Sequence, residues 1–407
     1  MKHLERDVLQ ITKGHGMSPK KPLLLAGFIS AAGLIASACG SSSSSTTTTS
    51  ATTSAPATTQ APTTTAAPNY AATEIPPTAN VSLQETGSTL LYPLFNLWAP
   101  DYSKAYPNIT ITTGGTGSGT GIADAANGTV DIGASDAYLS TTQTTKTPTL
   151  LNIPLAISAQ EIVYNIPGVT QQLDLTGQII SRIYQGKVQY WDDASIKAIN
   201  PSVALPHLLI SPVHRSDGSG DTFIFTQYLS KQDPAGWGAT VSYGTTVAFP
   251  TVSSALGANG NGGMVTTCGV TKGCIAYVGV SFASAAQKAG LTIAAISNEA
   301  GKFVTPSAAS IQAEAQSFIA QVPTNEAISL IDGPGDAAYP IINFEYAIVN
   351  SAQTDPNKAQ AIRSLLTWAI DPAHGNATSY ISQVNFQALP QSVAALSLAQ
   401  INKVQAG

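Results

Sequence analysis

Hydrophobic and polar residues follow two different patterns from about Val81 onward. Short runs of β-branched and other apolar residues, bounded by turn-forming residues, predict strands. The clearest strand candidates cover residues 109–112, 130–133, 161–165 and 275–278. Longer stretches with apolar side chains three and four positions apart predict helices. The helix candidates cover residues 94–106, 222–229 and 359–370.

The first helix candidate shows its pattern most clearly, with Leu94, Phe95, Trp98 and Tyr102 on one face. Side chains at this spacing line one side of a helix, which can then pack against a core. Strands that alternate with helices along the chain favour an α/β architecture. The 407 residues are enough for two domains of ordinary size.

The N-terminal stretch has the features of an export signal. Lys20 and Lys21 precede an uncharged run over residues 23–38, which ends in small residues directly before Cys39. The run is shorter than the roughly 20 apolar residues of a membrane-spanning helix. We therefore predict a signal peptide over residues 1–38, with Met17 as an alternative start.

Cys39 stands where bacterial lipoproteins carry their lipid, so the pattern predicts an exported chain anchored to the outer face of the cell membrane. Residues 39–80 are rich in Ser, Thr, Pro and Ala, and residues 40–68 contain no charged residue. Such a stretch buries too little apolar surface to offset the entropy of ordering it. We expect a disordered tether over residues 39–80, with the folded part beginning near Val81.

The charge balance restricts the kinds of partner. Charged residues make up 10% of the chain, against roughly 25% in an average soluble protein. The formal net charge is −5 for the whole chain, and it is about −8 once residues 1–38 are removed, because that stretch holds five basic and two acidic residues. A nucleic-acid-binding domain needs a clustered basic face. The composition therefore argues against a nucleic acid as partner.

The chain has three cysteines, and the prediction above assigns one of them, Cys39, to lipidation. If Cys39 carries lipid, Cys268 and Cys274 remain, separated by the five residues GVTKG. Outside the cell, where conditions are oxidising, such a pair predicts a disulfide. A metal site is the alternative, although it would need two further ligands nearby.

Three loops rich in glycine and hydroxyl residues each lead into a helical stretch. They are GSTLLYPL from Gly87, GGTGSGTGIADAANG from Gly114 and RSDGSGDTFIFTQYL from Arg215. A helix start exposes unpaired N–H groups and the positive end of the helix dipole. Three such starts that converge would form an anion site. The alternative is that each loop only caps its own helix.

Two charged residues accompany these loops. Arg215 begins the third loop and suits an oxyanion, which a guanidinium can bind through two parallel hydrogen bonds; alternatively it is a structural partner of Asp217. Asp136 follows the strand candidate at 130–133, where ligand-facing residues often lie in open α/β sheets. A turn or capping role is the alternative for Asp136.

Together these segments resemble the phosphate-binding proteins of ABC importers, particularly the mycobacterial lipoprotein form. The resemblance runs from about Val81 to the C-terminus and rests on GSTLLYPLFNLW, GTGSGTGI, GTVDIGASDAYLS, HRSDGSGDTFIFTQYLSKQDP and YPIINFEYAIVN. It implies a type II periplasmic-binding-protein fold, in which a two-strand hinge joins two α/β domains and the ligand lies in the cleft. Domain I is then expected over residues 81–157 plus 338–407, and domain II over residues 158–337.

The resemblance also implies which residues bind inorganic phosphate. The donors that it implies are Thr89, Leu90, Ser118, Arg215, Ser219 and Gly220. Asp217 is expected to orient Arg215, and Asp136 to accept the phosphate proton. At position 221 many relatives carry threonine, whereas this chain has the aspartate of the mycobacterial form. We interpret Asp221 as a second proton acceptor; an acid favoured by the helix dipole is the alternative.

Proton counting favours phosphate over other oxyanions. At neutral pH phosphate carries P–OH groups, whereas sulfate carries none. A buried carboxylate can accept a hydrogen bond from phosphate but meets only lone pairs on sulfate, which costs several kcal/mol. Asp136 therefore predicts discrimination against sulfate. A receptor for another oxyanion, such as sulfate or molybdate, is the alternative.

The resemblance implies a receptor rather than an enzyme, without a cofactor or metal, that acts as a monomer and delivers phosphate to the permease subunits of the importer. A phosphatase would need a nucleophile with a base, or metal ligands. His207, His214 and His374 have no ligand-like spacing, and Ser219 lies in DGSGD rather than G-x-S-x-G. An additional adhesion or signalling role stays open.

Overall fold

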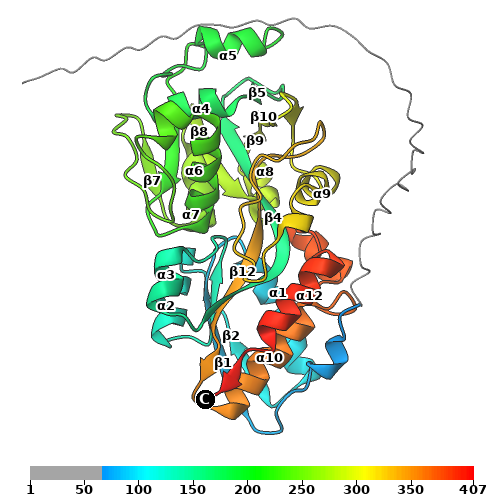
Figure 1. Cartoon of the computed structure of the whole chain (residues 1–407). Helices are drawn as coiled ribbons and strands as arrows, with labels where there is room; N and C mark the ends of the chain where they lie inside the picture. Colours follow the sequence, from blue (N-terminus) through cyan, green and yellow to red (C-terminus); the bar gives the residue numbers. More distant parts are fainter. Residues whose placement is uncertain (1–66) are drawn as a thin grey trace, which may run out of the picture. The chain divides into compact units, whose positions relative to one another are not determined.

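The structure is a computed structural model that describes residues 67–407 (Figure 1). The predictions for the signal peptide, Met17, the lipidated Cys39 and the tether up to residue 66 lie outside the described residues. Within residues 67–407, no helix combines the length and the apolar character that crossing a membrane requires.

A nine-stranded mixed sheet organises the folded part, in the order β2-β1-β3-β12-β4-β8-β6-β7, with β9 beside β4. Its strands are β1 (Val81–Gly87), β2 (Ile109–Thr112), β3 (Ile132–Ser135), β4 (Leu150–Asn165), β6 (Ser211–Arg215), β7 (Leu256–Ala258), β8 (Cys274–Gly279), β9 (Thr292–Ile293) and β12 (Ile342–Asn350). All four predicted strands are confirmed, although β3 starts later than expected and β4 is much longer. A three-stranded sheet contains β5 (Asp174–Leu175), β10 (Ala295–Ser297) and β11 (Phe303–Val304). A two-stranded sheet contains β13 (Ala352–Gln353) and β14 (Gln405–Ala406).

Two long antiparallel strands connect the two halves of this sheet. The first part of β4 pairs with β12, whereas Gln160–Asn165 at its end pair with β8. Strands β1–β3 therefore lie on one side of the β4–β12 pair and β6–β8 on the other, and Figure 1 shows β4 and β12 running between the two groups. This arrangement confirms two α/β groups joined by two strands. The boundaries at residues 157/158 and 337/338 stay a prediction.

A β-bulge interrupts the pairing of β4 with β12. Glu345 pairs with Ala156, but the next residue, Tyr346, pairs with Pro154, so Leu155 is the extra residue. Proline has no N–H to donate, and inside sheets it is found at bulges and edges. The bulge therefore accommodates Pro154 in a strand that sequence patterning recognised only from residue 161.

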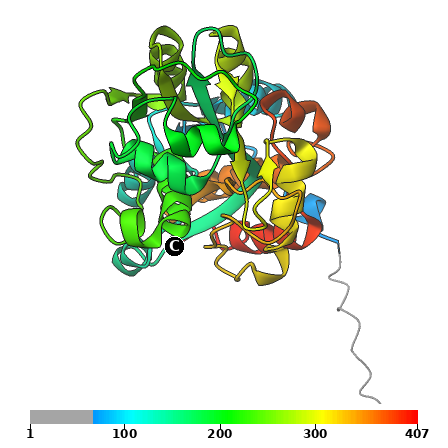
Figure 2. The same ribbon diagram turned by 90° about the horizontal axis from the view of Figure 1, so that it is seen from above.

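Helices cover both sides of the sheet. Those that accompany β1–β3 and β12 are α1 (Tyr92–Ala105), α2 (Ser118–Asn127), α3 (Thr141–Lys146), α10 (Pro356–Ile370), α11 (Thr378–Ile381) and α12 (Gln391–Ile401). Those of the other group are α4 (Gly177–Tyr184), α5 (Ala194–Ile199), α6 (Gly220–Gln232), α7 (Gly260–Val270) and α8 (Ala283–Lys288). Helix α9 (Ala308–Gln316) packs against the two connecting strands, β4 and β12. Figure 2 shows helices coloured green on one side of the central strands and helices coloured red on the other. The three predicted helices correspond to α1, α6 and α10.

The predicted apolar face of α1 is buried in the core, as expected. Leu94, Phe95, Trp98 and Tyr102 are all buried. The polar atoms of its two largest side chains are also bonded: Trp98 Nε1 donates to the Gly375 carbonyl at 2.9 Å, and the Tyr102 hydroxyl donates to a serine of α10. Burial of these rings therefore leaves no polar atom without a partner, which would be costly.

The ordered structure begins before Val81, earlier than the sequence suggested. Residues 70–72 form a short 3₁₀-helix. Asn108 Nδ2 donates to the carbonyls of Pro77 and Ala79, at 2.8 Å each, and the Tyr106 hydroxyl donates to Glu74 at 2.7 Å. The composition stays low in charge up to about residue 80. Composition therefore could not show that these residues contact others further along the chain. The predicted tether is therefore too long at its C-terminal end.

Cys268 and Cys274 form a disulfide between the end of α7 and the start of β8. Both residues are fully buried. The pairing agrees with the prediction from the sequence and leaves neither thiolate free for a metal.

Candidate functional site

The three glycine- and hydroxyl-rich loops each open a helix. The first leads into α1, the second into α2, which begins at Ser118, and the third into α6, which begins at Gly220. The predicted loops and the observed helix starts therefore coincide.

Ser88 holds the first loop in place. Its Oγ accepts hydrogen bonds from the backbone N–H groups of Leu90, at 3.1 Å, and Leu91, at 2.9 Å. Its own proton is donated to Asp136 Oδ1. Thr89, between these residues, is buried, and its Oγ1 accepts from Asn261 Nδ2 at 3.0 Å. Because Thr89 accepts this bond, its hydroxyl proton can be directed to a ligand.

The second loop packs directly against the third. The Gly119 N–H donates to the Gly218 carbonyl at 2.9 Å. Gly117 has a φ of +96°, and a Cβ placed there would lie 2.7 Å from both Asp217 Oδ2 and the Gly218 carbonyl oxygen. Only glycine can adopt this conformation at such close approach without strain. The contact brings loops from the two groups of elements together.

Ser118 and Asp136 form a buried pair at the start of α2. Ser118 Oγ donates to Asp136 Oδ2 at 3.2 Å, and the Asp136 backbone N–H lies 3.2 Å from the same Oγ. Gly220 lies against this pair, because a Cβ placed on it would be 2.5 Å from Asp136 Oδ2 and 2.7 Å from Ser118 Oγ. The backbone at the start of α6 therefore approaches Asp136 as closely as glycine allows.

Two carboxylates bind the guanidinium of Arg215 along two of its edges. Its Nε donates to Asp217 Oδ1 at 2.7 Å, Nη2 donates to Asp217 Oδ2, and Nη1 donates to Asp221 Oδ2. Arg215 is 4% exposed. Burial alone would lower the pKa of Arg215, but its hydrogen bonds and the negative charges of Asp217 and Asp221 raise this pKa above its ordinary value. The guanidinium is therefore a permanent positive charge with a fixed orientation, and the expected contact with Asp217 is present.

Asp136 titrates near neutrality. Burial is the main cause, the charge of Asp221 adds to it, and hydrogen bonds from Glu345 and Ser88 together with the charge of Arg215 act in the opposite direction. The result raises the pKa of Asp136 to about 7. A carboxyl group with this pKa is well suited to accept or release a proton at physiological pH.

Asp221 is enclosed by donors. Its Oδ2 accepts from Arg215 and from Asn261 Nδ2, the latter at 2.8 Å, and its Oδ1 accepts from Gln160 Nε2 at 3.3 Å. Burial raises the pKa of Asp221, although the charge of Arg215 opposes this. Because Arg215 and Asn261 already share Oδ2, the carboxylate has limited remaining capacity to accept a proton from a ligand.

All the predicted binding residues lie in one connected set of contacts. Thr89 reaches Asp221 through Asn261, and Asp221 reaches Arg215. Ser219 Oγ caps α6 by accepting from the Thr222 N–H at 3.2 Å. The predicted residues brought together are Thr89, Leu90, Ser118, Asp136, Arg215, Ser219, Gly220 and Asp221, and Asp217 lies beside them.

Sequence reasoning gave no role in the site to four residues of this set. Ser88 lies in the first predicted loop, and the other three, Gln160, Asn261 and Glu345, lie outside all three loops. Asn261 lies in the first turn of α7 and bonds to Thr89 Oγ1 and Asp221 Oδ2. The segment GANGNGG, which runs from the end of β7 into the first turn of α7, is a fourth glycine-rich helix start. This segment contains no serine or threonine, so the pattern of glycine with hydroxyl residues did not identify it. Glu345 could have been noticed as the one charged residue in the apolar strand INFEYAIVN.

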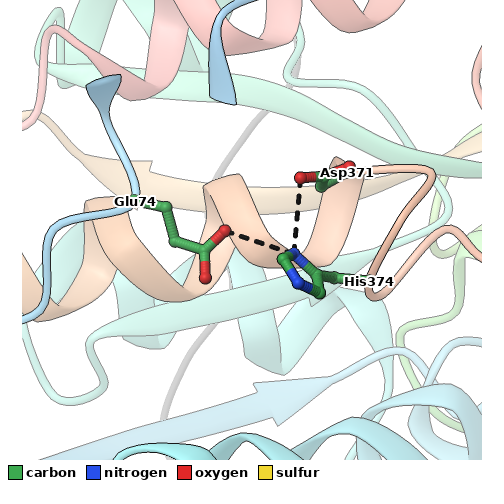
Figure 3. Close-up of side chains that lie close together, drawn as sticks. All are labelled: Glu74, Asp371 and His374. Atoms are coloured by element: carbon green, nitrogen blue, oxygen red, sulfur yellow. Dashed lines mark ion pairs between the residues drawn. The ribbon is translucent and has the colours of Figure 1, made fainter. Parts of the chain in front are cut away.

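Among residues 67–407, one group of side chains has the composition of a metal site: Glu74, Asp371 and His374 (Figure 3). His374 Nδ1 lies 3.4 Å from Glu74 Oε2 and 3.3 Å from Asp371 Oδ2. The second oxygen of Glu74 accepts from Tyr106, and that of Asp371 accepts from the Ala373 N–H. These contacts join the segment before β1 to the residues that follow α10. It lies outside the set of contacts around Asp136.

The fold and the site place the chain in a large class of binding proteins: residues 41–373 match the family described as PBP superfamily domain. Among its relatives, the phosphate-binding protein PstS of Methanocaldococcus jannaschii is 34% identical over 346 residues, which cover 80% of this chain and 87% of that protein. The chain therefore belongs to the PstS family of phosphate-binding proteins.

A second relative agrees with this assignment, and a solved structure agrees with the fold. The phosphate-binding protein PstS 2 of Mycobacterium tuberculosis is 29% identical over 338 residues, covering 79% of this chain and 87% of that protein. The structure of a periplasmic phosphate-binding protein, PfluDING, bound with phosphate, has a TM-score of 0.63 at 21% identity over 78% of this chain and 93% of that chain. The structural likeness confirms the predicted two-domain α/β fold.

Proposed function

We propose that this chain is an extracellular receptor for inorganic phosphate that delivers its ligand to the membrane subunits of an ABC-type importer. Membership of the PstS family supports the class of ligand. The observation that carries the proposal is the convergence of three helix starts, one guanidinium and one proton-accepting carboxyl group on a single buried location.

Helix starts provide most of the donors in this proposal. The N–H groups at the beginnings of α1, α2 and α6, with the hydroxyls of Thr89 and Ser219, surround the anion. The N–H of Ser118 is among them, whereas the Ser118 hydroxyl donates to Asp136. Each N-terminus adds partial positive charge, so an acidic protein can bind an anion through local dipoles rather than its net charge. Arg215 adds the one full positive charge, pre-oriented by Asp217.

Asp136 provides the selectivity. As an ionised carboxylate it accepts a hydrogen bond from a P–OH group of phosphate. Sulfate offers no such proton, and two facing negative charges in a buried site cost several kcal/mol, roughly a thousandfold in affinity. A receptor for sulfate or molybdate would therefore not be expected to keep an acid at this position.

For Asp221 we propose a role other than the second proton acceptor that the sequence predicts. Its contacts with Arg215, Asn261 and Gln160 support a role in positioning the donors across the site. As a second proton acceptor, Asp221 would have to exchange one of these partners for the ligand.

The hinge and the cellular location complete the proposal. We place the hinge where β4 and β12 cross between domain I (residues 81–157 and 338–407) and domain II (residues 158–337), so that the ligand contacts both domains. Export is typical of this family of receptors. Lipid anchoring through Cys39 and the contact with particular permease subunits are further parts of the proposal, supported by the pattern around Cys39.

Calorimetry with the purified chain tests the proposal. Phosphate is expected to bind tightly with one site per chain, and sulfate at the same concentration to give no measurable heat. Tighter binding of sulfate or molybdate would replace phosphate by another oxyanion. Turnover of a chromogenic phosphate ester, lost on Ser219→Ala, would instead point to a phosphatase.

A further inference from the structure

Glu345 lies beside the candidate site and has no part in the phosphate contacts described above. It is on β12 at the β-bulge, and it is fully buried. Ser158 Oγ, from β4, donates to Glu345 Oε1, and Asn343 Nδ2 donates to the same oxygen at 3.0 Å. Two strands that cross between the domains therefore fix this side chain.

The second oxygen of Glu345 has no protein N–H or hydroxyl donor. Its neighbour is the carboxyl group of Asp136. Strand β12 pairs Tyr346 with Ser135 of β3, so Glu345 lies opposite Asp136 where β3 ends, and the two carboxyl groups lie within hydrogen-bonding reach of each other. Asn343 also connects the two residues, because its Nδ2 lies 3.3 Å from the Asp136 carbonyl oxygen. Two carboxyl groups can form a hydrogen bond only if one of them carries a proton.

The surroundings indicate which of the two carries the proton. Burial, the charge of Asp136 and the bond to Asp136 all raise the pKa of Glu345 well above its ordinary value. The same bond lowers the pKa of Asp136, which also receives hydrogen bonds from Ser88 and Ser118. Asp136 therefore has the partners of an ionised carboxylate, and Glu345 has those of a neutral acid.

We propose that Glu345 is a positioning residue that donates its carboxyl proton to Asp136 and keeps Asp136 ionised to accept a proton from the ligand. The inference rests on the proposed phosphate-binding function. A carboxylate has about four acceptor positions on its two oxygens. Ser88, Ser118 and Glu345 fill three of them, so Asp136 retains capacity for one further donor. That donor is a single P–OH group of phosphate.

Other charged or titratable groups also face this pair. Asp221, on α6, repels the charge of Asp136, and Arg215, at the end of β6, attracts it. Ser88, Ser118, Ser158 and Asn343 contribute uncharged donors. Because Arg215 and Asp221 belong to domain II, Glu345 is the acid of domain I that adjusts the protonation of Asp136.

The test compares two substitutions of Glu345 by calorimetry with phosphate over about pH 6–8. Glu345→Gln keeps an N–H donor of similar size and is expected to bind phosphate within about threefold of the wild type. Glu345→Leu removes the donor, so the pKa of Asp136 rises and Asp136 becomes protonated near neutrality. We expect a loss of about tenfold or more at the acid end, which shrinks as the pH rises.

Dividing each variant's affinity by that of the wild type at the same pH cancels the titration of phosphate itself. Glu326→Leu removes another fully buried glutamate that lies outside the set of contacts around Asp136, and it serves as the matched control. Equal affinities of Glu345→Leu and wild type across the pH range would overturn the proposal. So would an equal, pH-independent loss in both Glu345 variants. If the wild type itself fails to bind phosphate, the proposed function fails instead.

Infrared spectroscopy keeps the proposal testable if Glu345→Leu does not fold. The wild type at neutral pH is expected to show the C=O stretch of a protonated carboxylic acid that disappears in Glu345→Gln. The absence of any band that responds to this substitution would show that Glu345 is ionised and would overturn the proposal.

Discussion

Different side chains of the site provide its positive charge and its proton acceptor. Arg215 is fixed by Asp217 through its Nε and Nη2, so its orientation is set before any ligand arrives. Asp136, with a pKa of about 7, is held by Ser88 and Ser118. A ligand that enters therefore meets one fixed cation and one fixed acceptor, and little reorganisation is needed.

Arg215→Lys is expected to weaken phosphate binding by roughly tenfold to a hundredfold, because lysine cannot bond to Asp217 and an anion in the planar geometry of a guanidinium. Calorimetry measures the loss. Arg363→Lys is the matched control, since Arg363 Nη1 donates to the Val404 carbonyl away from the site. Phosphate affinity in Arg215→Lys equal to that of the control would show that the guanidinium is only structural.

Helix starts decide how closely a ligand can approach the backbone. Gly220 begins α6 with Asp136 and Ser118 immediately beside it. A side chain there would have to displace one of these two groups. The position therefore matters for the shape of the site more than for the stability of the helix, in which alanine would ordinarily be preferred.

Gly220→Ala is expected to lower phosphate affinity by about tenfold or more, because its Cβ would overlap Asp136 Oδ2 and Ser118 Oγ. Gly262→Ala, in the first turn of α7, is the control, since the nearest atom to its added Cβ, apart from its chain neighbours and its own helix backbone, is a Phe282 carbon at 3.8 Å. Titration of both variants with phosphate measures the difference. Equal affinities would mean that the start of α6 does not contact the ligand.

Elements with strong local signals were predicted from the sequence, and elements that depend on distant contacts were not. Glycine and hydroxyl residues alone predicted that the loop from Gly114 leads into a helix, and α2 begins within that segment at Ser118. Most of β4 escaped prediction because Pro154 breaks the strand pattern, and only pairing with β12 explains the bulge there. Asn261 and Glu345 join the site through partners far away in sequence, which no local pattern reveals.

The whole folded chain buries an unusual number of acids. Glu85, Glu161, Glu314 and Glu326 are all buried, and burial is the main cause that raises their pKa values, to about 8 for the first three and about 9 for Glu326. In the unfolded chain the same groups ionise near pH 4.3. The folded state therefore holds protons that the unfolded state releases between these limits.

Because the folded state binds more protons in this range, these acids destabilise the fold as the pH rises from about 4.3 toward 9. Glu326→Gln removes one such titration, so its stability advantage over the wild type is expected to grow with pH and to level off above the pKa of Glu326. Urea unfolding at several pH values measures this difference, with the exposed Glu299→Gln as control. A difference in stability between Glu326→Gln and the wild type that does not change with pH would contradict the raised pKa of Glu326.

The most direct test of the central claim is the selectivity of Asp136→Asn, measured as phosphate and sulfate affinities by calorimetry. Asparagine offers an N–H group where the carboxylate accepted a proton, so we expect phosphate affinity to fall and the preference for phosphate over sulfate to shrink by about a hundredfold or more. Asp332→Asn, at a similarly buried aspartate bonded to Gln232, controls for the loss of a buried acid. If Asp136→Asn keeps the wild-type preference for phosphate over sulfate, Asp136 does not accept the ligand's proton.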